Sequence, residues 1–369
     1  MSEFFQQLIN GLSLGSIYAL IALGYTMVYG VLRFINFAHS DVFMVGAFAG
    51  YYLGNLFGGH FASISPLSWP AAAVTGFLLG ILNAAAFSSK PVRAKLLPMA
   101  VWGIAGCLGL LVLNRALPFM REKVLPSMIF KNLFTLGIVT LIVSMALCAY
   151  LGILIERLAY RPLRDHSKLN VLITAIGVSL LLENAGQFFF GAAPKSFPTL
   201  FPSKSFHFLG GLVLSSNQIT IFIVTAVLLV SMRFIVLKTR IGTAMRAVSF
   251  NPLAASLVGI NNDVVISFTF GLGSALAAAG GILYSMNYQA IDPLMGILPG
   301  LKAFVAAVLG GIGNIPGAAL GGLLLGIVEV FVNGSRYSTY TDAIAFSVLI
   351  LILLFRPAGL LGKLQVEKV

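Results

Sequence analysis

The chain has 369 residues, of which 59% are hydrophobic and only 9% are charged. A soluble domain carries about 25% charged residues, so this composition cannot supply a water-exposed surface and lipid must cover most of the protein. The formal net charge of +12 falls in short clusters between apolar runs, a pattern typical of topology signals and headgroup contacts rather than of nucleic-acid binding.

Apolar runs of membrane-spanning length occur along the whole chain. A spanning helix needs about 20 residues, and the runs predict an all-α membrane protein over residues 1–369, a polytopic helical bundle of about 10–11 membrane segments. In chain order the predicted segments are Leu8–Leu32, Phe34–Phe57, Pro70–Phe87, Leu96–Asn114, Asn132–Ile155, Val171–Phe190, Ile219–Leu237, Val264–Met286, the short run Leu301–Leu309, Ala318–Val332 and Ala343–Phe355.

Lysine and arginine set the expected orientation, because cytoplasmic loops carry the excess of positive charge. Three basic segments therefore belong on the cytoplasmic side: residues 157–168, 238–246 and 356–368. The stretch 191–218, rich in Pro, Phe and Ser, reads as an external loop.

The first polar constellation is VLRFINFAHSD at residues 31–41, between two apolar runs with hardly any loop. Polar side chains at membrane depth usually line a cavity or pair with one another, and a break between half-helices needs protein or water to satisfy its backbone. The alternative is a tight cytoplasmic turn with solvated side chains. His39 is not expected to bind a metal, since no second His or Cys lies at ligand spacing.

A basic, carboxylate-free segment occupies residues 239–260, TRIGTAMRAVSFNPLAASLVGI. Asn251-Pro252 predicts a turn that restarts a helix, so we expect a helix–turn–helix long enough to dock into a groove of another protein. The alternative is a membrane-surface helix held by anionic lipids.

The C-terminal half contains a short apolar run from Lys302 that ends in GGIGNIPG at 310–317. Glycine and proline there predict a re-entrant or discontinuous helix. A phosphate loop is excluded, because the stretch lacks the GK[ST] that such a loop needs. The pairs Gly11-x3-Gly15 and Gly322-x3-Gly326 are expected to let helices approach closely.

Ionisable residues inside apolar segments are candidate pathway residues, although they could equally fix helix packing. Asp263, Asp292 and Asp342, by contrast, are expected only to mark interfaces with water. The predicted substrate pathway comprises Asn36, His39, Asp41, Glu183, Asn184, Gly311, Gly313 and Glu329.

Five stretches in the same order resemble the permease subunits of ABC importers for branched-chain amino acids, the LivH-type family. They are GLSLGSIYALIALGYTMVYG (11–30) with INFAHSD (35–41), ERLAYRPLR (156–164), the segment 239–260, KAFVAAVLGGIGNIPGAALGGLLLGIVE (302–329) and FRPAGLLGK (355–363). Two departures stand out: Ser40-Asp41 replaces the Gly-Glu common in the family, and residues 88–131 look like an extra helical pair.

The resemblance implies a permease of the bacterial inner membrane that works with a second, different permease subunit, two cytoplasmic ATPases and a periplasmic binding protein. ATP and Mg²⁺ would belong to the ATPases, with no cofactor in this chain. The segment 239–260 would be the cytoplasmic coupling loop, whose expected contact positions are Arg240, Gly242, Ala244, Arg246, Ala247, Asn251, Pro252, Ala255 and Gly259.

Two other functions remain to be weighed. An ion-coupled secondary transporter would need a coupling carboxylate, for which Asp41, Glu183 or Glu329 could serve. A membrane enzyme is not expected, because no Ser/His/Asp or paired His/carboxylate cluster occurs at plausible depth.

Overall fold

Long apolar runs form long helices in the computed structural model, which describes residues 2–57, 133–164, 166–208, 211–356 and 358–362, with isolated positions between 80 and 104. The helices are α1 (Ser2–Leu32), α2 (His39–Phe57), α5 (Leu133–Ile155), η2 (Glu156–Tyr160), η3 (Arg161–Leu163), α6 (Lys168–Phe190), α7 (Ser216–Lys238), α8 (Arg240–Phe250), α9 (Pro252–Leu257), α10 (Asn262–Tyr288), α11 (Ile297–Gly310), α12 (Ile315–Asn333), η4 (Ser338–Tyr340) and α13 (Thr341–Phe355). The strands are β1 (Lys195–Ser196), β2 (Ser205–Phe208), β3 (Leu212–Ser215) and β4 (Ala290–Ile291).

Six helical stretches within the described ranges are long and apolar enough to cross a membrane. They comprise α1, the run Phe134–Leu163, α6, α7, α10 and α12. Helices α2, α11 and α13 match three further predicted segments. The all-α membrane fold is therefore confirmed. The predicted segments Pro70–Phe87 and Leu96–Asn114, and the extra pair 88–131, fall outside the described residues apart from isolated positions.

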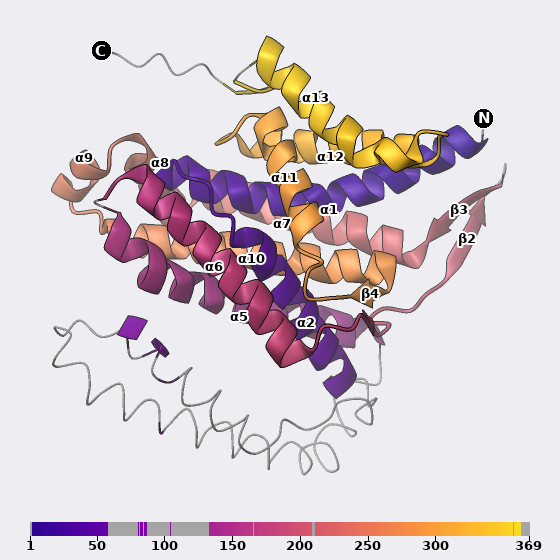
Figure 1. The fold of residues 1–369 in the computed structure, drawn as a ribbon, viewed down its shortest axis with the longest axis horizontal. Coiled ribbons are helices and arrows are strands. Elements are labelled where there is room, and N and C mark those ends of the chain that lie inside the picture. The colour runs from indigo at the N-terminus through magenta and orange to yellow at the C-terminus, as the bar shows by residue number, and fades with distance from the viewer. Residues whose placement is uncertain are drawn as a thin grey trace.

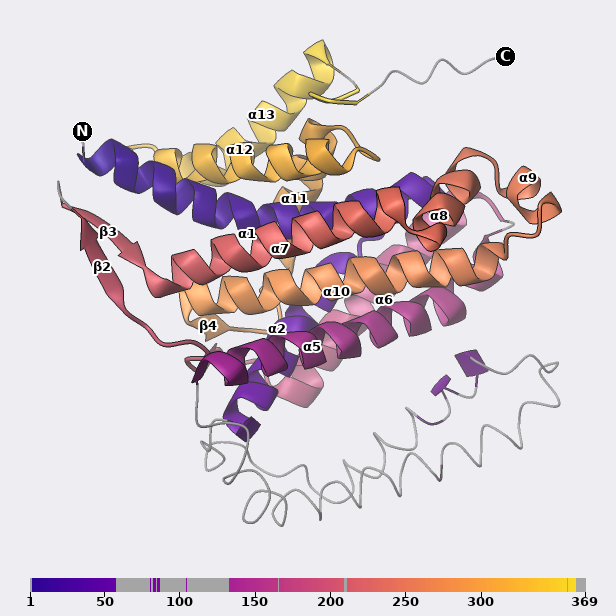
Figure 2. The same cartoon turned by 180° about the vertical axis from the view of Figure 1, so that it is seen from behind.

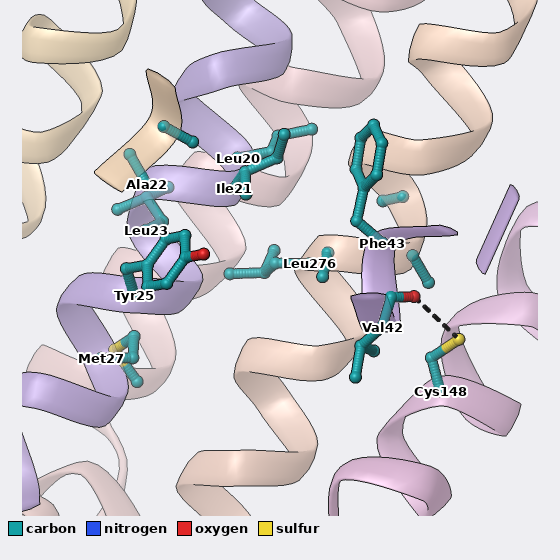
Figure 3. Close-up of a cluster of buried hydrophobic side chains, with 14 of the residues drawn as sticks. Leu20, Ile21, Ala22, Leu23, Tyr25, Met27, Val42, Phe43, Cys148 and Leu276 are labelled. Atoms are coloured by element: carbon teal, nitrogen blue, oxygen red, sulfur yellow. Dashed lines mark hydrogen bonds between the residues drawn. The ribbon is translucent and has the colours of Figure 1, made fainter. Parts of the chain in front are cut away.

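Helices α1 and α10 form the centre of the bundle, with α12, α2 and α5 packed around them (Figures 1 and 2). Glycine permits the closest of these contacts: a Cβ on Gly15 would lie 2.7 Å from Cα of Leu323, and one on Gly322 would lie 2.6 Å from Cα of Ala19. The two predicted glycine pairs thus meet along one seam between α1 and α12. Figure 3 shows the apolar core between α1, α2 and α10, where Leu20, Phe43 and Leu276 are at most 2% exposed.

The basic segments gather at one end of the bundle. Arg161 and Arg164 of η3 and the turn after it pair with Asp263 at the start of α10, and Arg164 also pairs with the buried Glu156. Helices α8 and α9 project from this same end (Figure 1). Asp263 was expected to mark only a boundary with water, so these ion pairs are an addition from the structure.

The opposite end carries short strands. β2 and β3 form an antiparallel hairpin with Ser205 opposite Ser215, and it lies beside the N-terminus of the chain (Figure 1). β1 pairs with β4, Lys195 opposite Ile291. The stretch 191–218, predicted as a loop, thus contains three strands and is joined to the residues that precede α11.

Candidate functional site

The segment after α1 turns back into the bundle. Arg33 adopts a left-handed backbone conformation (φ 55°) directly after α1 ends. The His39 ring nitrogen Nε2 then lies 3.2 Å from the carbonyl oxygen of Ile21. Ile21 precedes the end of α1 by eleven residues, about 16 Å at 1.5 Å per residue. Helix α2 therefore begins near the middle of the bundle.

Three polar residues of this segment are buried and paired. The exposed fractions of Asn36, His39 and Asp41 are 5%, 1% and 1%. The Tyr160 hydroxyl donates to Asn36 Oδ1 at 2.6 Å, and the Ser179 hydroxyl donates to Asp41 Oδ2 at 2.5 Å. Such pairing is typical of polar groups inside a membrane bundle. It favours the break between half-helices over the solvated turn.

Helix α11 starts at the same depth in the bundle as α2 and runs in the opposite direction. Gly296 and Gly300 lie against Ser40, so closely that a Cβ at either glycine would overlap it. From this junction α2 runs toward the end that bears the strands, whereas α11 runs toward the end that bears the basic segments. At 14 residues, α11 is about 21 Å long, too short to span a bilayer.

The glycine-rich stretch after α11 ends this half-helix. Gly311 and Gly313 have φ values of 103° and 91°, a region that only glycine adopts readily. The C-terminal segment covers this turn, since the backbone N–H of Leu360 donates to the carbonyl of Leu309 at 2.8 Å. Asn314 then caps α12 through Gly317 N–H. The predicted discontinuous helix is present at this place.

An apolar hollow lies next to the junction. Its lining residues come from α1, α11 and the two non-helical stretches: Tyr25, Tyr29, Ile35, Phe304, Ala307 and Ile312. The Tyr25 ring lies 4.7 Å from the His39 ring and 6.0 Å from the Phe304 ring, measured between centroids. The hollow therefore adjoins the start of α2 and offers aromatic and aliphatic contacts.

The predicted pathway residues separate into two clusters. Glu183 follows Ser179 by one helical turn on α6, so it lies on the face near Asp41. Asn184 is exposed and bonds only the Leu180 carbonyl of its own helix among the described contacts. Glu329, by contrast, contacts Lys302 on α11. Sequence reasoning did not identify Lys302 as functional, nor Asp342 as its second partner.

The segment 239–260 forms the predicted helix–turn–helix. Thr239 caps α8 and Asn251 caps α9, with Pro252 in its first turn. Gly242 lies directly against the backbone of Ile235 and Val236, and the Arg246 guanidinium donates to the Val236 carbonyl. The two helices are thereby fixed to α7 at a tight corner.

The tip of this helix–turn–helix is apolar, a feature that sequence reasoning did not single out. Four hydrophobic side chains there are among the most exposed in the chain: Phe250 88%, Leu253 72%, Leu257 81% and Val258 77%. Of the predicted contact positions, Arg240, Asn251, Pro252 and Gly259 are exposed, Ala244 and Ala247 are half-buried, and Ala255 is buried. Among the described residues, no group of three or more His, Cys, Asp or Glu could hold a metal ion.

Comparison with known proteins agrees with the family resemblance found in the sequence, and the similarity extends along the whole chain. One protein family, described as branched-chain amino acid transport system / permease component, matches residues 7–105 and 98–353. The chain belongs to this family. It is 38% identical over 371 residues to the high-affinity branched-chain amino acid transport system permease protein BraD of Pseudomonas aeruginosa, covering 100% of this chain and 98% of the relative.

Other members of the permease family agree. The LivH permease protein of Escherichia coli K12 is 36% identical over 371 residues, covering 99% and 98% of the two chains. A probable LivH permease protein of Methanocaldococcus jannaschii is 30% identical over 254 residues, covering 60% and 78%. No solved structure matches. The permease is a multi-pass protein of the bacterial inner membrane, and its family consists of transport subunits.

Proposed function

We propose that this permease is the membrane-spanning subunit of an ATP-driven importer for branched-chain and other hydrophobic amino acids. The observation that carries the proposal is the full-length similarity to relatives named as permeases of high-affinity branched-chain amino acid transport systems. Transport would proceed by alternating access, with ATP hydrolysed on separate subunits and the amino acid delivered by a periplasmic binding protein.

The apolar tip of α8–α9 supports a cytoplasmic ATPase partner. Helices α8 and α9 project from the basic end of the bundle (Figure 1) and carry the exposed side chains of Phe250, Leu253 and Leu257. A short helix with such side chains suits a hydrophobic groove. Gly242 and Arg246 fix the tip to α7. A push on the tip would therefore reach the membrane helices rather than be absorbed by a loose loop.

The junction of α2 and α11 supports a central substrate pathway. Its hollow is lined by Tyr25, Tyr29 and Phe304 among others. The hollow is too small to hold a leucine side chain in this structure, so its apolar lining would become part of the path when the junction opens. The same site carries no free cation among its described lining residues, so an amino acid would be held weakly and could leave. Asp41 and Glu183 lie on the α2–α6 side of this region and could attract an α-ammonium group.

The exposed face of α6 supports a second permease subunit. Asn170, Gly177 and Asn184 are exposed at seven-residue spacing, so they share one helix face. A Cβ at Gly177 would meet nothing within 4 Å. Polar and small residues are unfavourable against lipid but typical of helix–helix contacts, so a partner chain suits this face better than the bilayer.

Uptake by reconstituted components tests the function. Proteoliposomes containing this permease, its partner permease and the ATPases should accumulate radiolabelled leucine only with ATP inside and loaded binding protein outside. A catalytically inactive ATPase provides the matched control. Leucine uptake by this chain alone under a proton or sodium gradient would instead establish the ion-coupled transporter, which the comparisons do not favour.

A further inference from the structure

A buried lysine joins three helices near the start of α11. Lys302 Nζ lies 2.7 Å from Glu329 Oε1 on α12 and 2.7 Å from Asp342 Oδ1 on α13. The Lys302 and Glu329 side chains are 8% and 7% exposed, and that of Asp342 is 49% exposed. We call these three residues the charge clamp.

The clamp adds an ionic link to a helix that is already packed against α1 and α12. Helix α11 is anchored at its start by the contact of Gly296 and Gly300 with Ser40 and at its end by the bond from Leu360 N–H. Near its C-terminal end α11 packs directly on α12, where Gly321 lies against Ala306. Lys302, in the second turn, adds charged contacts to both α12 and α13. Because α11 does not cross the bundle, its position depends on contacts with the neighbouring helices rather than on anchors in both interfaces, and the charge clamp is the charged part of those contacts.

Fold stability alone is a poor reason for this arrangement. Well-packed apolar residues usually replace a buried ion pair without loss of stability, whereas removal of one partner leaves an uncompensated charge. Glu329 Oε2 has no hydrogen-bond partner among the described residues, so Lys302 is its main compensation there. A single ammonium shared by two helices does, however, give a directional link that an apolar contact lacks.

We infer that Lys302 is a positioning residue for transport: the charge clamp makes α11, α12 and α13 move as one body, so that the junction with Ser40 opens and closes as these helices shift. This inference rests on the proposed function and assigns to Glu329 a mechanical role rather than direct contact with substrate. The clamp sets how far α11 moves when the complex is driven by ATP.

The test uses the complete complex in proteoliposomes. The triple variant Lys302→Met/Glu329→Gln/Asp342→Asn removes every charge of the clamp and leaves none unpaired. It should reach the membrane and bind the ATPases at wild-type levels. Its maximal leucine uptake rate should fall about tenfold, while the KM for loaded binding protein stays unchanged. The variant Lys302→Glu/Glu329→Lys/Asp342→Asn, which exchanges the charges of the buried pair, should recover part of the lost rate.

A milder variant guards against a folding defect. Asp342→Asn keeps the buried Lys302–Glu329 pair and unties only α13, so it should lower the uptake rate several-fold in a protein of normal abundance. Glu3→Gln, an exposed acid at the same end, is the matched control and should transport normally. Wild-type rates in the triple variant or in Asp342→Asn would overturn the inference. Failure of the wild-type complex to transport would count instead against the proposed function.

Discussion

At single positions, glycine determines how closely the helices of this permease approach. Gly326 on α12 lies against the backbone of Gly15 on α1, with no room for a Cβ. Gly177 on α6 faces open space. Within the isolated chain the same residue type therefore has opposite effects: Gly326 is necessary for the packing of α1 on α12, whereas Gly177 only lowers the stability of its own helix.

Alanine at these two glycines should change stability in opposite directions. Gly326→Ala should destabilise the detergent-solubilised chain by about 1–3 kcal/mol, since α1 and α12 must move apart. Gly177→Ala should be neutral or stabilise it by up to about 1 kcal/mol. Thermal unfolding of the two variants measures both effects, and equal midpoints would contradict the close α1–α12 packing.

Buried polar residues were predictable, but their partners were not. The position of Asn36, His39 and Asp41 between apolar runs indicated membrane depth. Tyr160 and Ser179 come from other elements more than a hundred residues away. The sequence states only that a buried polar group needs a partner, and the packing of the helices decides which one. Asp342, expected to mark an interface with water, is half-exposed, and only the structure shows that it also pairs with Lys302.

Among the elements, α8 and α9 form a projection that is packed on α7 at its base and has an apolar end. Asn251-Pro252 was enough to predict the turn between them, because both residues have strong local preferences at helix starts. Exposure of Leu253 and Leu257 could not be predicted, since an apolar side chain on a short helix is usually buried. Here α9 extends beyond the bundle, and its apolar side faces away from it.

A charge at this apolar end should separate the permease from its ATPases. Leu253→Glu would have to bury a carboxylate in the docking groove, which should weaken association at least about tenfold. Leu253→Met keeps an apolar side chain of similar volume and serves as the matched control. Co-purification and substrate-stimulated ATP hydrolysis measure the effect, and unchanged values for both variants would remove α9 from the ATPase contact.

The sequence predicted one end of the half-helix α11 but not the other. The short run ending in GGIGNIPG predicted a broken helix, and α11 ends there as expected. Its start was predicted at Leu301, four residues after the observed start at Ile297, because Pro299 and Gly300 interrupt the apolar run. Tertiary contact with Ser40 fixes that boundary. The strands β1–β4 were missed, since two- to four-residue strands give too short a pattern of alternation.

At the scale of the whole molecule, burial is distributed unevenly around the bundle. Helices α1 and α10 are buried by neighbouring helices, whereas most residues of α6 and α7 are not covered by the rest of the chain (Figure 2). The polar stripe Asn170, Gly177 and Asn184 distinguishes the α6 surface from the purely apolar one expected against lipid. This stripe is the face on which we propose that the second permease subunit packs.

A bulky residue on the α6 stripe should block assembly without unfolding the chain. Gly177→Leu fits the open space of the isolated permease, so its thermal midpoint should not fall. Co-purification with the second permease should be lost, because the partner helix can no longer approach closely. Val230→Leu at an exposed position of α7 should assemble normally. Retention of the partner by Gly177→Leu would exclude this face as the contact.

The two-residue pairing of β1 with β4 has a mechanical consequence. β1 belongs to the stretch between α6 and α7, which is predicted to be external, and five residues separate β4 from the start of α11. A protein that binds this surface and displaces β1 should also displace β4, because the backbones of the two strands are hydrogen-bonded. A protein bound to this surface would thereby shift the residues that lead into α11 without contacting α11 itself.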